Sequence, residues 1–553
     1  MRRMKTCALL LAVVVGLVPF PALARPVGAV LGGIPAPGSC VTGLTWDGKS
    51  LWAADHKSDR LYRLDPGSGK ILGSIPSPGY RPAGLAWDGS RLWNVDPIEN
   101  RIYRLDPGRG LVDRTVEAPV PEASALAWDG KHLWLASPRT GRMHRIDRGD
   151  GTTIDAHPTP SASVDGMAFD GRYLWIADRI ADKLHVVDPG SGEVLLSVDA
   201  PGPHVTGLAF DGKQLWVADY QTDRIYRVEH AGDGLPLRQA RKEERVLYTH
   251  QLRNLGPGTL TEADIYVAVP GDNPSQKLAG PPRFTPAPRA IVTDRWGQKV
   301  AHFRFENVQA GQFATVTMAA RATLYDVRHQ VLPHQVKGLG AIPADARRFL
   351  ADGSKYQIRS PTIRKAVAKA VGKEKNPYWI ARKIYRYVHG KMFYKLSGGW
   401  NVAPRVLERG NGSCSEYSFV FIAMCRAAGI PARYIGSIVV RKDDASYDDV
   451  FHRWVEIYLP GYGWLPVDPS RGDKPGEVDR SDAFGHLEPA FLITTVGGGG
   501  SRYLTWKYNS DERWVCRGRC NVAVENIAEW EPAGKQRTDA KRSFTVGTPG
   551  RCE

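Results

Sequence analysis

A period of 41 residues runs through the first half of this 553-residue chain. Each unit contains an aromatic residue followed by Asp and Gly, then a Leu-Trp pair, and later a third apolar segment such as RLYRLDPG. A period near 40 residues with four short strands is typical of β-propeller blades. The triplets are Trp46-Asp47-Gly48, Trp87-Asp88-Gly89, Trp128-Asp129-Gly130, Phe169-Asp170-Gly171 and Phe210-Asp211-Gly212.

The two ends of the repeat predict how the ring closes. The fifth unit stops at RIYRVEH without a fourth strand, and residues 27–34 (VGAVLGGI) form a strand-like segment before the first unit. We expect these segments to share one blade and to close five blades over residues 25–230, with a degenerate sixth blade as the alternative. The repeat resembles NHL-like and YVTN-like propellers, a resemblance that implies a fold but no particular activity. We interpret the recurring Asp55, Asp96 and Asp178 as turn formers.

Beyond residue 230 the composition changes several times. Residues 231–245 lose the period and become polar, which predicts a linker, and the alternation in 246–330 predicts a β-sandwich. Helical spacing begins later, with Ser360-Pro361 and Asn376-Pro377 as helix starts. We therefore expect an α+β domain over residues 331–530 and a disordered tail over 531–553.

The N-terminus has the pattern of a secretory signal peptide. Basic residues open the chain, residues 7–18 are apolar, and Ala22-Leu23-Ala24 is a small-residue cleavage site. The apolar run is too short for a comfortable membrane span. We expect residues 1–24 to be cleaved and the mature chain to be secreted or held in the periplasm or cell envelope, without a membrane span. An uncleaved anchor is the alternative.

The charge balance bears on the partners of the protein. The chain has 74 basic and 58 acidic residues, a formal net charge of +16. Such a surface suits an acidic cell envelope, and a basic surface without a special partner is the alternative. Because the basic residues are scattered and export separates the chain from chromosomes, we predict no nucleic-acid partner.

The cysteines suggest disulfides rather than a metal site. Cys516 and Cys520 lie close enough in the sequence to pair, but pairing of either with Cys40 or Cys552 remains open. Disulfides persist outside the cytoplasm. Because no second cysteine pair or histidine cluster completes a ligand set, we predict no metal.

Cys414 occupies the predicted first turn of a helix. Ser413 and Glu416 match a capping box, apolar residues follow at helical spacing, and Gly429 ends the helix. Backbone N–H groups and the helix dipole stabilise a thiolate at this position, which lowers the pKa of the thiol. Cys414 is therefore a candidate nucleophile, with a capped structural cysteine as the alternative. We expect Cys425, three turns further on, to be a core residue.

A predicted hairpin supplies a base and a carboxylate. Residues 449–470 (DVFHRWVEIYLPGYGWLPVDPS) alternate as two strands, and a turn centred on Pro460 would put His452 opposite Asp468. Opposed side chains lie roughly 5 Å apart, close enough for Asp to hold one imidazole nitrogen while the other faces a thiol. A slip of one residue would separate the two side chains. The alternatives are a strand histidine without a role and an aspartate that only forms a turn.

These stretches resemble the transglutaminase-like superfamily, the papain-like branch with a Cys-His-Asp triad. GNGSCSEYS, CRAAGIPAR and HRWVEIYLPGYGWLPVDPS occur in the family's order within about residues 330–500. The resemblance implies Cys414 as nucleophile, His452 as general base and acid, and Asp468 as orienting carboxylate. It also implies that the Cys414 N–H and one upstream donor hold the oxyanion. Trp400 is a candidate neighbour, although we expect a core or rim residue there.

The predicted architecture is therefore multidomain: an all-β propeller, a β-sandwich and an α+β papain-like domain. The predicted function is an exported cysteine enzyme that acts on amide bonds of protein or peptide substrates through a thioester, without a cofactor. Hydrolysis, as in a protease or amidase, is favoured over cross-linking, and the propeller would bind substrate or a partner. The alternative is a non-catalytic cell-surface scaffold or adhesion protein that uses the propeller.

Overall fold

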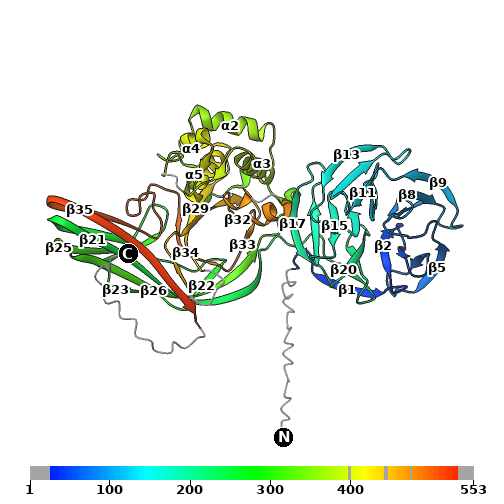
Figure 1. Cartoon of the computed structure of the whole chain (residues 1–553), viewed down its shortest axis with the longest axis horizontal. Coiled ribbons are helices and arrows are strands. Elements are labelled where there is room, and N and C mark those ends of the chain that lie inside the picture. The colour runs from blue at the N-terminus through cyan, green and yellow to red at the C-terminus, as the bar shows by residue number, and fades with distance from the viewer. Residues whose placement is uncertain (1–24, 397–399, 441–445, 474–475, 534–553) are drawn as a thin grey trace, which may run out of the picture.

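The computed structural model describes residues 25–396, 400–440, 446–473 and 476–533, and most of its regular structure is β (Figure 1). The first half forms four-stranded antiparallel sheets whose strands follow chain order. The first two are β2 (Val41–Trp46), β3 (Leu51–Asp55), β4 (Arg60–Leu64), β5 (Ile71–Pro76), and β6 (Leu85–Trp87), β7 (Leu92–Asp96), β8 (Arg101–Leu105), β9 (Val112–Glu117). The next two are β10 (Ala125–Trp128), β11 (Leu133–Ser137), β12 (Arg142–Ile146), β13 (Thr153–Pro158), and β14 (Gly166–Phe169), β15 (Leu174–Asp178), β16 (Lys183–Val187), β17 (Val194–Asp199).

A fifth sheet joins the two ends of the repeat. It contains β18 (Val205–Phe210), β19 (Leu215–Asp219), β20 (Arg224–Val228) and, on its outer edge, β1 (Val30–Pro35). β1 and β20 are antiparallel, with Ile34 opposite Ile225. The predicted sharing of one sheet by the first and last strands is confirmed. The first strands of the sheets contact one another in the cyclic order β2, β6, β10, β14, β18 and again β2, which closes a ring.

The repeated triplets form the turns that the sequence predicts. In the second sheet Asp88 Oδ1 accepts the backbone N–H groups of Ser90 and Arg91, and Gly89 has a φ of +96°. Asp88 Oδ2 accepts a bond from the buried indole of Trp93 at 2.9 Å. Equivalent Asp–Trp bonds recur in the other sheets of the ring. The repeat therefore preserves a turn together with the tryptophan that packs between sheets.

The once-per-repeat aspartates are buried and serve backbone turns. Asp96 Oδ1 accepts the N–H groups of Ile98 and Glu99 at 2.8 and 3.0 Å. Asp55 and Asp178 accept backbone N–H groups in the same way. Their interpretation as turn formers is confirmed.

Small residues fill the places where neighbouring first strands meet. Glycines stand at positions 43, 84, 166 and 207, which is again the 41-residue period, and position 125 holds alanine. A Cβ at Gly84 would overlap the backbone nitrogen of Leu126, and one at Gly207 would lie 2.8 Å from the carbonyl carbon of Gly43. The ring therefore closes by direct backbone contact between its innermost strands.

One long strand organises the second region. β21 (Leu237–Ala268) pairs on one side with β26 (Phe313–Arg328) and β25 (Lys299–Val308) and on the other with β35 (Ser510–Pro532). The shorter strands of this nine-stranded sheet are β22 (Gln276–Leu278), β23 (Arg283–Thr285), β24 (Ala290–Thr293), β30 (Ser446–Asp448) and β33 (His486–Leu487). Figure 1 shows β35 crossing the whole sheet beside β21.

This sheet corrects two predicted boundaries. Residues 237–245 of the predicted linker (231–245) belong to β21. Most of their charged side chains are partly or fully exposed on this strand, although Glu244 is buried, so their polarity reflects an exposed strand and not a free segment. The predicted β-sandwich (246–330) does not end as a separate unit, because β35, whose residues 510–530 fall in the predicted 331–530 domain, completes the same sheet. Alternation identifies a strand, but it does not identify a partner some 250 residues away.

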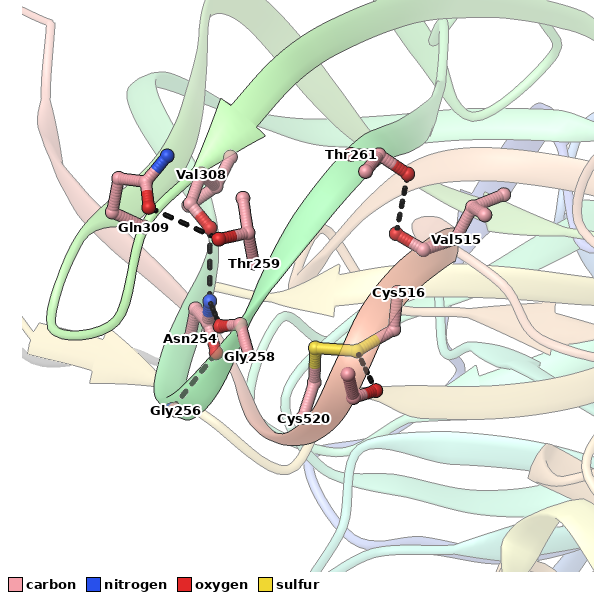
Figure 2. Close-up of a disulfide and its surroundings, with 11 residues drawn as sticks. Asn254, Gly256, Gly258, Thr259, Thr261, Val308, Gln309, Val515, Cys516 and Cys520 are labelled. Carbon is pink, nitrogen blue, oxygen red and sulfur yellow. Dashed lines mark hydrogen bonds between the residues drawn. A yellow bond between two sulfur atoms is a disulfide. The ribbon is translucent and has the colours of Figure 1, made fainter.

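A disulfide lies on β35 beside the most irregular part of β21 (Figure 2). Cys516 bonds to Cys520, which is one of the pairings that the sequence leaves open, while Cys40, Cys414 and Cys425 carry free thiols. The amide of Asn254 donates to the Gly258 and Val308 carbonyls at 2.9 and 2.8 Å, and these bonds hold the neighbouring loop (Figure 2). Cys7 and Cys552 lie outside the described residues.

The remaining elements form the predicted α+β region. Its sheet has the order β32 (Gly463–Val467), β31 (His452–Leu459), β29 (Ala432–Val439), β34 (Phe491–Gly497), and a second small pair joins β27 (Phe393–Tyr394) to β28 (Asn411–Gly412). Its helices are α1 (Ala344–Arg347), α2 (Pro361–Val371), α3 (Pro377–His389), α4 (Ala403–Arg409), α5 (Cys414–Ala427) and α6 (Glu477–Asp482). Short 3-10 turns are η1 (Pro333–Gln335), η2 (Leu339–Ala341), η3 (Arg348–Leu350) and η4 (Arg471–Asp473). Ser360 and Asn376 cap α2 and α3, as predicted.

The ring docks on this α+β region through the outer strand of its fourth sheet. Arg382 on α3 reaches Glu193, with Nε 2.8 Å from Oε2, and donates to the Val194 carbonyl at 3.0 Å. On α6, Ser481 donates to the Leu195 carbonyl at 3.1 Å. Buried apolar side chains from both regions form one continuous cluster across this contact.

Two predictions fall on residues at the ends of the chain. The signal peptide (1–24) lies outside the described residues, as does the tail (531–553) apart from its first residues, and Glu531 and Pro532 end β35. Among the described residues, every helix is too short or too polar to cross a bilayer.

Candidate active site

The start of α5 has the local structure that the sequence predicts. Ser413 is the N-cap, and the Glu416 carboxylate accepts the Ser413 N–H at 3.3 Å. Glu416 is fully buried and also accepts from the Asn401 N–H at 3.1 Å and from Arg409 at 2.7 Å. These bonds anchor the turn that places Cys414 at the first helical position. Cys425 on the same helix is fully buried, as expected of a core residue.

The hairpin that carries His452 has a register different from the predicted one. Tyr458 lies opposite Trp464 and Val455 opposite Val467, so the turn is centred on Gly461 and not on Pro460. The backbone N–H of Tyr462 donates to the Leu459 carbonyl at 3.0 Å, and Gly461 and Gly463 have positive φ. The glycines allow a turn displaced by one residue, which shifts the strand pairing by two. Because side chains alternate with a period of two, this shift leaves the predicted face unchanged.

The three predicted site residues lie together. His452 Nε2 is 2.7 Å from Asp468 Oδ2, and Asp468 follows directly after β32. Asp468 Oδ1 also accepts the Ser470 hydroxyl at 2.7 Å and the Ser470 N–H at 2.9 Å, which fixes the carboxylate. The thiol of Cys414 hydrogen-bonds with the imidazole. With Nε2 engaged by Asp468, Nδ1 is the nitrogen that remains for the sulfur.

The electrostatics of this group favour an ionised pair. Burial alone would raise the pKa of Cys414, but the hydrogen bond to His452 and the positive charges of His452 and Arg453 bring it below its ordinary value. Burial alone would lower the pKa of His452, but Asp468 and Cys414 raise it. The pKa of Asp468 is lowered by His452 and Ser470 against the effect of burial. These shifts favour a thiolate beside an imidazolium.

Two tyrosines near the thiol could not be assigned from the sequence. The hydroxyl of Tyr394 accepts the backbone N–H of Cys414, which is the group expected to bind an oxyanion. Tyr508 bonds to Ser415 and lies within electrostatic range of the thiol. The sequence around Tyr394 and the segment 502–509 around Tyr508 have no periodic pattern that would place them near Cys414. Their position beside the thiol is therefore seen only in the folded chain. Trp400 stacks on Tyr508 with ring centres 6.2 Å apart, which makes it a packing residue.

The exposure of the group is small and uneven. Cys414 is 6% exposed, while the side chains of His452 and Asp468 keep 18% and 11% of their surface. The imidazole also lies against Phe491 and Trp454, with ring centres 5.6 and 5.9 Å away. Among the described residues, no cluster of His, Cys, Asp and Glu side chains has the arrangement of a metal site. The arrangement is suited to proton transfer and nucleophilic attack by sulfur.

A thiol at a helix start that faces an imidazole and a carboxylate from an antiparallel hairpin defines a papain-like cysteine site. Residues 364–469 match the family model of the transglutaminase-like superfamily. The chain therefore contains a transglutaminase-like domain, and this domain includes Cys414, His452 and Asp468.

Curated relatives match a short part of the chain. A protein-glutamine gamma-glutamyltransferase of Pseudomonas aeruginosa is 28% identical over 117 residues, which are 18% of this chain and 17% of that protein. An uncharacterized protein of Haemophilus influenzae is 32% identical over 123 residues, 18% of this chain and 33% of that protein. This chain thus spans a third or less of the length of these relatives.

A solved structure covers a larger share of the chain. A candidate cysteine protease from Cytophaga hutchinsonii aligns over 55% of this chain and 95% of its own, with 16% identity and a TM-score of 0.40.

Proposed function

We propose that this protein is an exported cysteine enzyme that acts on amide bonds of protein or peptide substrates through a thioester. The observation that carries the proposal is the convergence of Cys414, His452 and Asp468 at the start of α5. The signal-like N-terminus and the Cys516–Cys520 disulfide support export, because disulfides persist outside the cytoplasm. The net charge of +16 favours residence at an acidic cell envelope.

The proposed chemistry begins with the ionised pair. The Cys414 thiolate attacks the amide carbonyl, and the resulting oxyanion takes the place of the Tyr394 hydroxyl at the Cys414 N–H. The tetrahedral intermediate collapses, the C–N bond breaks, and the proton held by His452 goes to the leaving amine. The product is a thioester on Cys414, with His452 neutral and ready to act as a base.

The second half of the reaction decides the class of enzyme. His452 takes a proton from water or from an amine, which attacks the thioester and releases the thiolate. Water gives hydrolysis, as in a protease or amidase, and a lysine amine gives a cross-link. The 18% exposure of the His452 side chain gives water access to the base, which favours hydrolysis. The relative named as a gamma-glutamyltransferase makes cross-linking the second candidate.

The ring of sheets is proposed to be a five-bladed propeller that recruits substrate or a partner. Each four-stranded sheet would be one blade, and the direct contact of innermost strands leaves the outer surfaces for binding. The fourth sheet is occupied by α3 and α6, so the remaining sheets are available to present a substrate near the site.

A product analysis tests this function. The mature chain is incubated with a cell-envelope protein extract and dansylcadaverine, a fluorescent amine, and the products are identified by mass spectrometry. New peptide termini indicate a protease, conversion of Gln to Glu an amidase, and incorporation of the amine a transferase. Cys414→Ala should abolish every one of these products. Unchanged products from Cys414→Ala would contradict the mechanism.

A further inference from the structure

Arg453, the residue after His452, is a fully buried cation without a carboxylate partner among the described residues. Its Nη2 donates to the Trp506 carbonyl at 2.6 Å. Nε and Nη1 have no hydrogen-bond partner in the described part of the chain. A buried charge that is neither paired nor fully bonded is strongly unfavourable, so the fold must compensate for it in another way.

Four aromatic rings surround the guanidinium. Its central carbon lies 4.4 Å from the ring centre of Tyr508, 4.5 Å from Tyr434, 4.8 Å from Trp400 and 5.2 Å from Phe419. Such contacts stabilise a cation, and more strongly when it is removed from water. The cage excludes water and holds the charge in one place, but it does not supply a negative charge.

Burial raises the pKa of the cage residues Tyr434 and Tyr508, so these phenols stay neutral. The Cys414 sulfur is a group within electrostatic range of the guanidinium that can become an anion at lower pH. The backbone N–H of Arg453 donates to this sulfur, and the guanidinium is within electrostatic range of it. The other titratable groups that face the sulfur are His452 from β31, Tyr394 from β27 and Tyr508 from the segment before β35, and Asp468 acts through His452. Arg453 is the member of this set whose charge does not depend on pH.

We propose that Arg453 is a positioning residue of the proposed active site, whose caged charge and backbone N–H hold the Cys414 sulfur as a thiolate. The thiolate in turn supplies the negative charge that the buried guanidinium lacks. His452 loses its charge whenever it gives up its proton, and Arg453 then keeps a positive charge at the sulfur. The thiolate is thus restored as leaving group when the thioester is resolved.

This inference deepens the proposed function, but it concerns the ionisation of one thiol and needs no substrate for its test. In a background that carries Cys40→Ser and Cys552→Ser, Cys414 is the reactive free thiol among the described residues, because Cys425 is fully buried. The rate of Cys414 alkylation by iodoacetamide is followed by intact-protein mass spectrometry across acid and alkaline pH. The midpoint of the rate profile reports the pKa of the thiol.

Three variants separate charge from packing. Arg453→Met removes the charge and keeps the length, and Arg453→Lys keeps a positive charge. Arg426→Met is the matched control, because Arg426 on α5 is as buried but donates to the Ala432 and Ala351 carbonyls and does not act on Cys414.

We expect Arg453→Met to raise the midpoint by about one pH unit or more. Arg453→Lys should stay near wild type, and Arg426→Met should lower thermal stability without moving the midpoint. A profile of Arg453→Met that overlies wild type, or an equal shift in Arg426→Met, would overturn the proposal. If the midpoint moves but Cys414→Ala keeps its enzymatic products, the proposed function fails and the role of Arg453 stands.

A second measurement covers the case in which Arg453→Met does not fold. In a His452→Ala background, the wild-type cysteine is compared with Cys414→Ser by thermal unfolding at several pH values. Because the charge and backbone N–H of Arg453 then oppose the effect of burial together with the helix start, the cysteine should gain stability over serine as the pH rises through the thiol range. A difference that is constant, or that reverses, would overturn the proposal.

Discussion

Glu193→Gln is expected to weaken the docking of the ring on the α+β region more than Arg382→Met, the substitution of its buried partner, does. Glu193 lies just before β17, with its side chain 4% exposed, and Arg382 on α3 is 2% exposed. Arg386, 47% exposed, is a second cation at 2.5 Å from the same carboxylate. Among the residues that the structure describes, Arg382 thus has one anionic partner, whereas Glu193 has two cationic ones.

This asymmetry predicts different costs for the two single substitutions. Glu193→Gln leaves the Arg382 charge buried, held by the Val194 carbonyl and the rings of Tyr385 and Phe484, and should cost about 3–5 kcal/mol. Arg382→Met leaves Glu193 paired with the partly solvated Arg386 and should cost about 1–3 kcal/mol. In the double variant no buried charge is unpaired, so its cost should be smaller than that of Glu193→Gln alone.

Urea unfolding of the full chain, followed by tryptophan fluorescence, measures these costs. The four proteins of the cycle are compared by their midpoints and slopes. If Arg382→Met proves as costly as Glu193→Gln, or if Glu193→Gln costs less than about 1 kcal/mol, the reasoning from burial and partner number is wrong.

Three further predictions concern the site and the ring. Asp468→Asn should slow Cys414 alkylation at neutral pH by tenfold or more in a rate assay, because the carboxylate raises the pKa of His452. Asp468 and Cys414 together raise the pKa of His452 from 6.5 to about 10 against the effect of burial. The stability that His452 contributes is therefore complete below pH 6.5 and is lost as the pH rises through about 10. Thermal midpoints of wild type and Asp468→Asn should therefore converge at alkaline pH. Gly84→Ala should lower the thermal midpoint by several degrees, because its Cβ would overlap the Leu126 backbone, whereas Gly73→Ala, which faces open space in β5, should not.

Local features of this fold were predictable because short stretches determine them. The Asp-Gly turns, the caps of α2 and α3 and the start of α5 depend on residues within four positions of one another. The pairing of β1 with β20 was predictable for a different reason. A repeat that lacks one strand at its end and has one extra strand at its beginning leaves a single simple way to complete the sheet.

Long-range pairing and turn register were harder to predict. β35 pairs with β21, and the sequence of neither strand indicates which strand is its partner. The predicted boundaries at residues 245 and 330 were therefore wrong. The hairpin register differs from the predicted one by two residues. The turn is centred on Gly461 and not on Pro460, and the positive φ angles of Gly461 and Gly463 permit it. The site tolerated this error, since a shift by two keeps His452 and Asp468 on one face.

Arg453 shows a third kind of limit. Alternation along residues 451–458 places it in a strand, where an arginine is expected to be exposed. Its cage combines rings from α5, β29 and two separate segments, at positions 400, 419, 434 and 508. A residue whose role depends on four distant rings becomes recognisable only when the chain is folded.

The central claim is that Cys414 is a thiolate held by His452, and competitive alkylation of the free thiols tests it most directly. Burial raises the pKa of Cys40 and Cys425, whereas the pKa of Cys414 is lowered. A limiting amount of iodoacetamide at neutral pH should therefore modify Cys414 first, and His452→Ala should remove this preference. Equal and slow modification of Cys414 in wild type and His452→Ala would contradict the account.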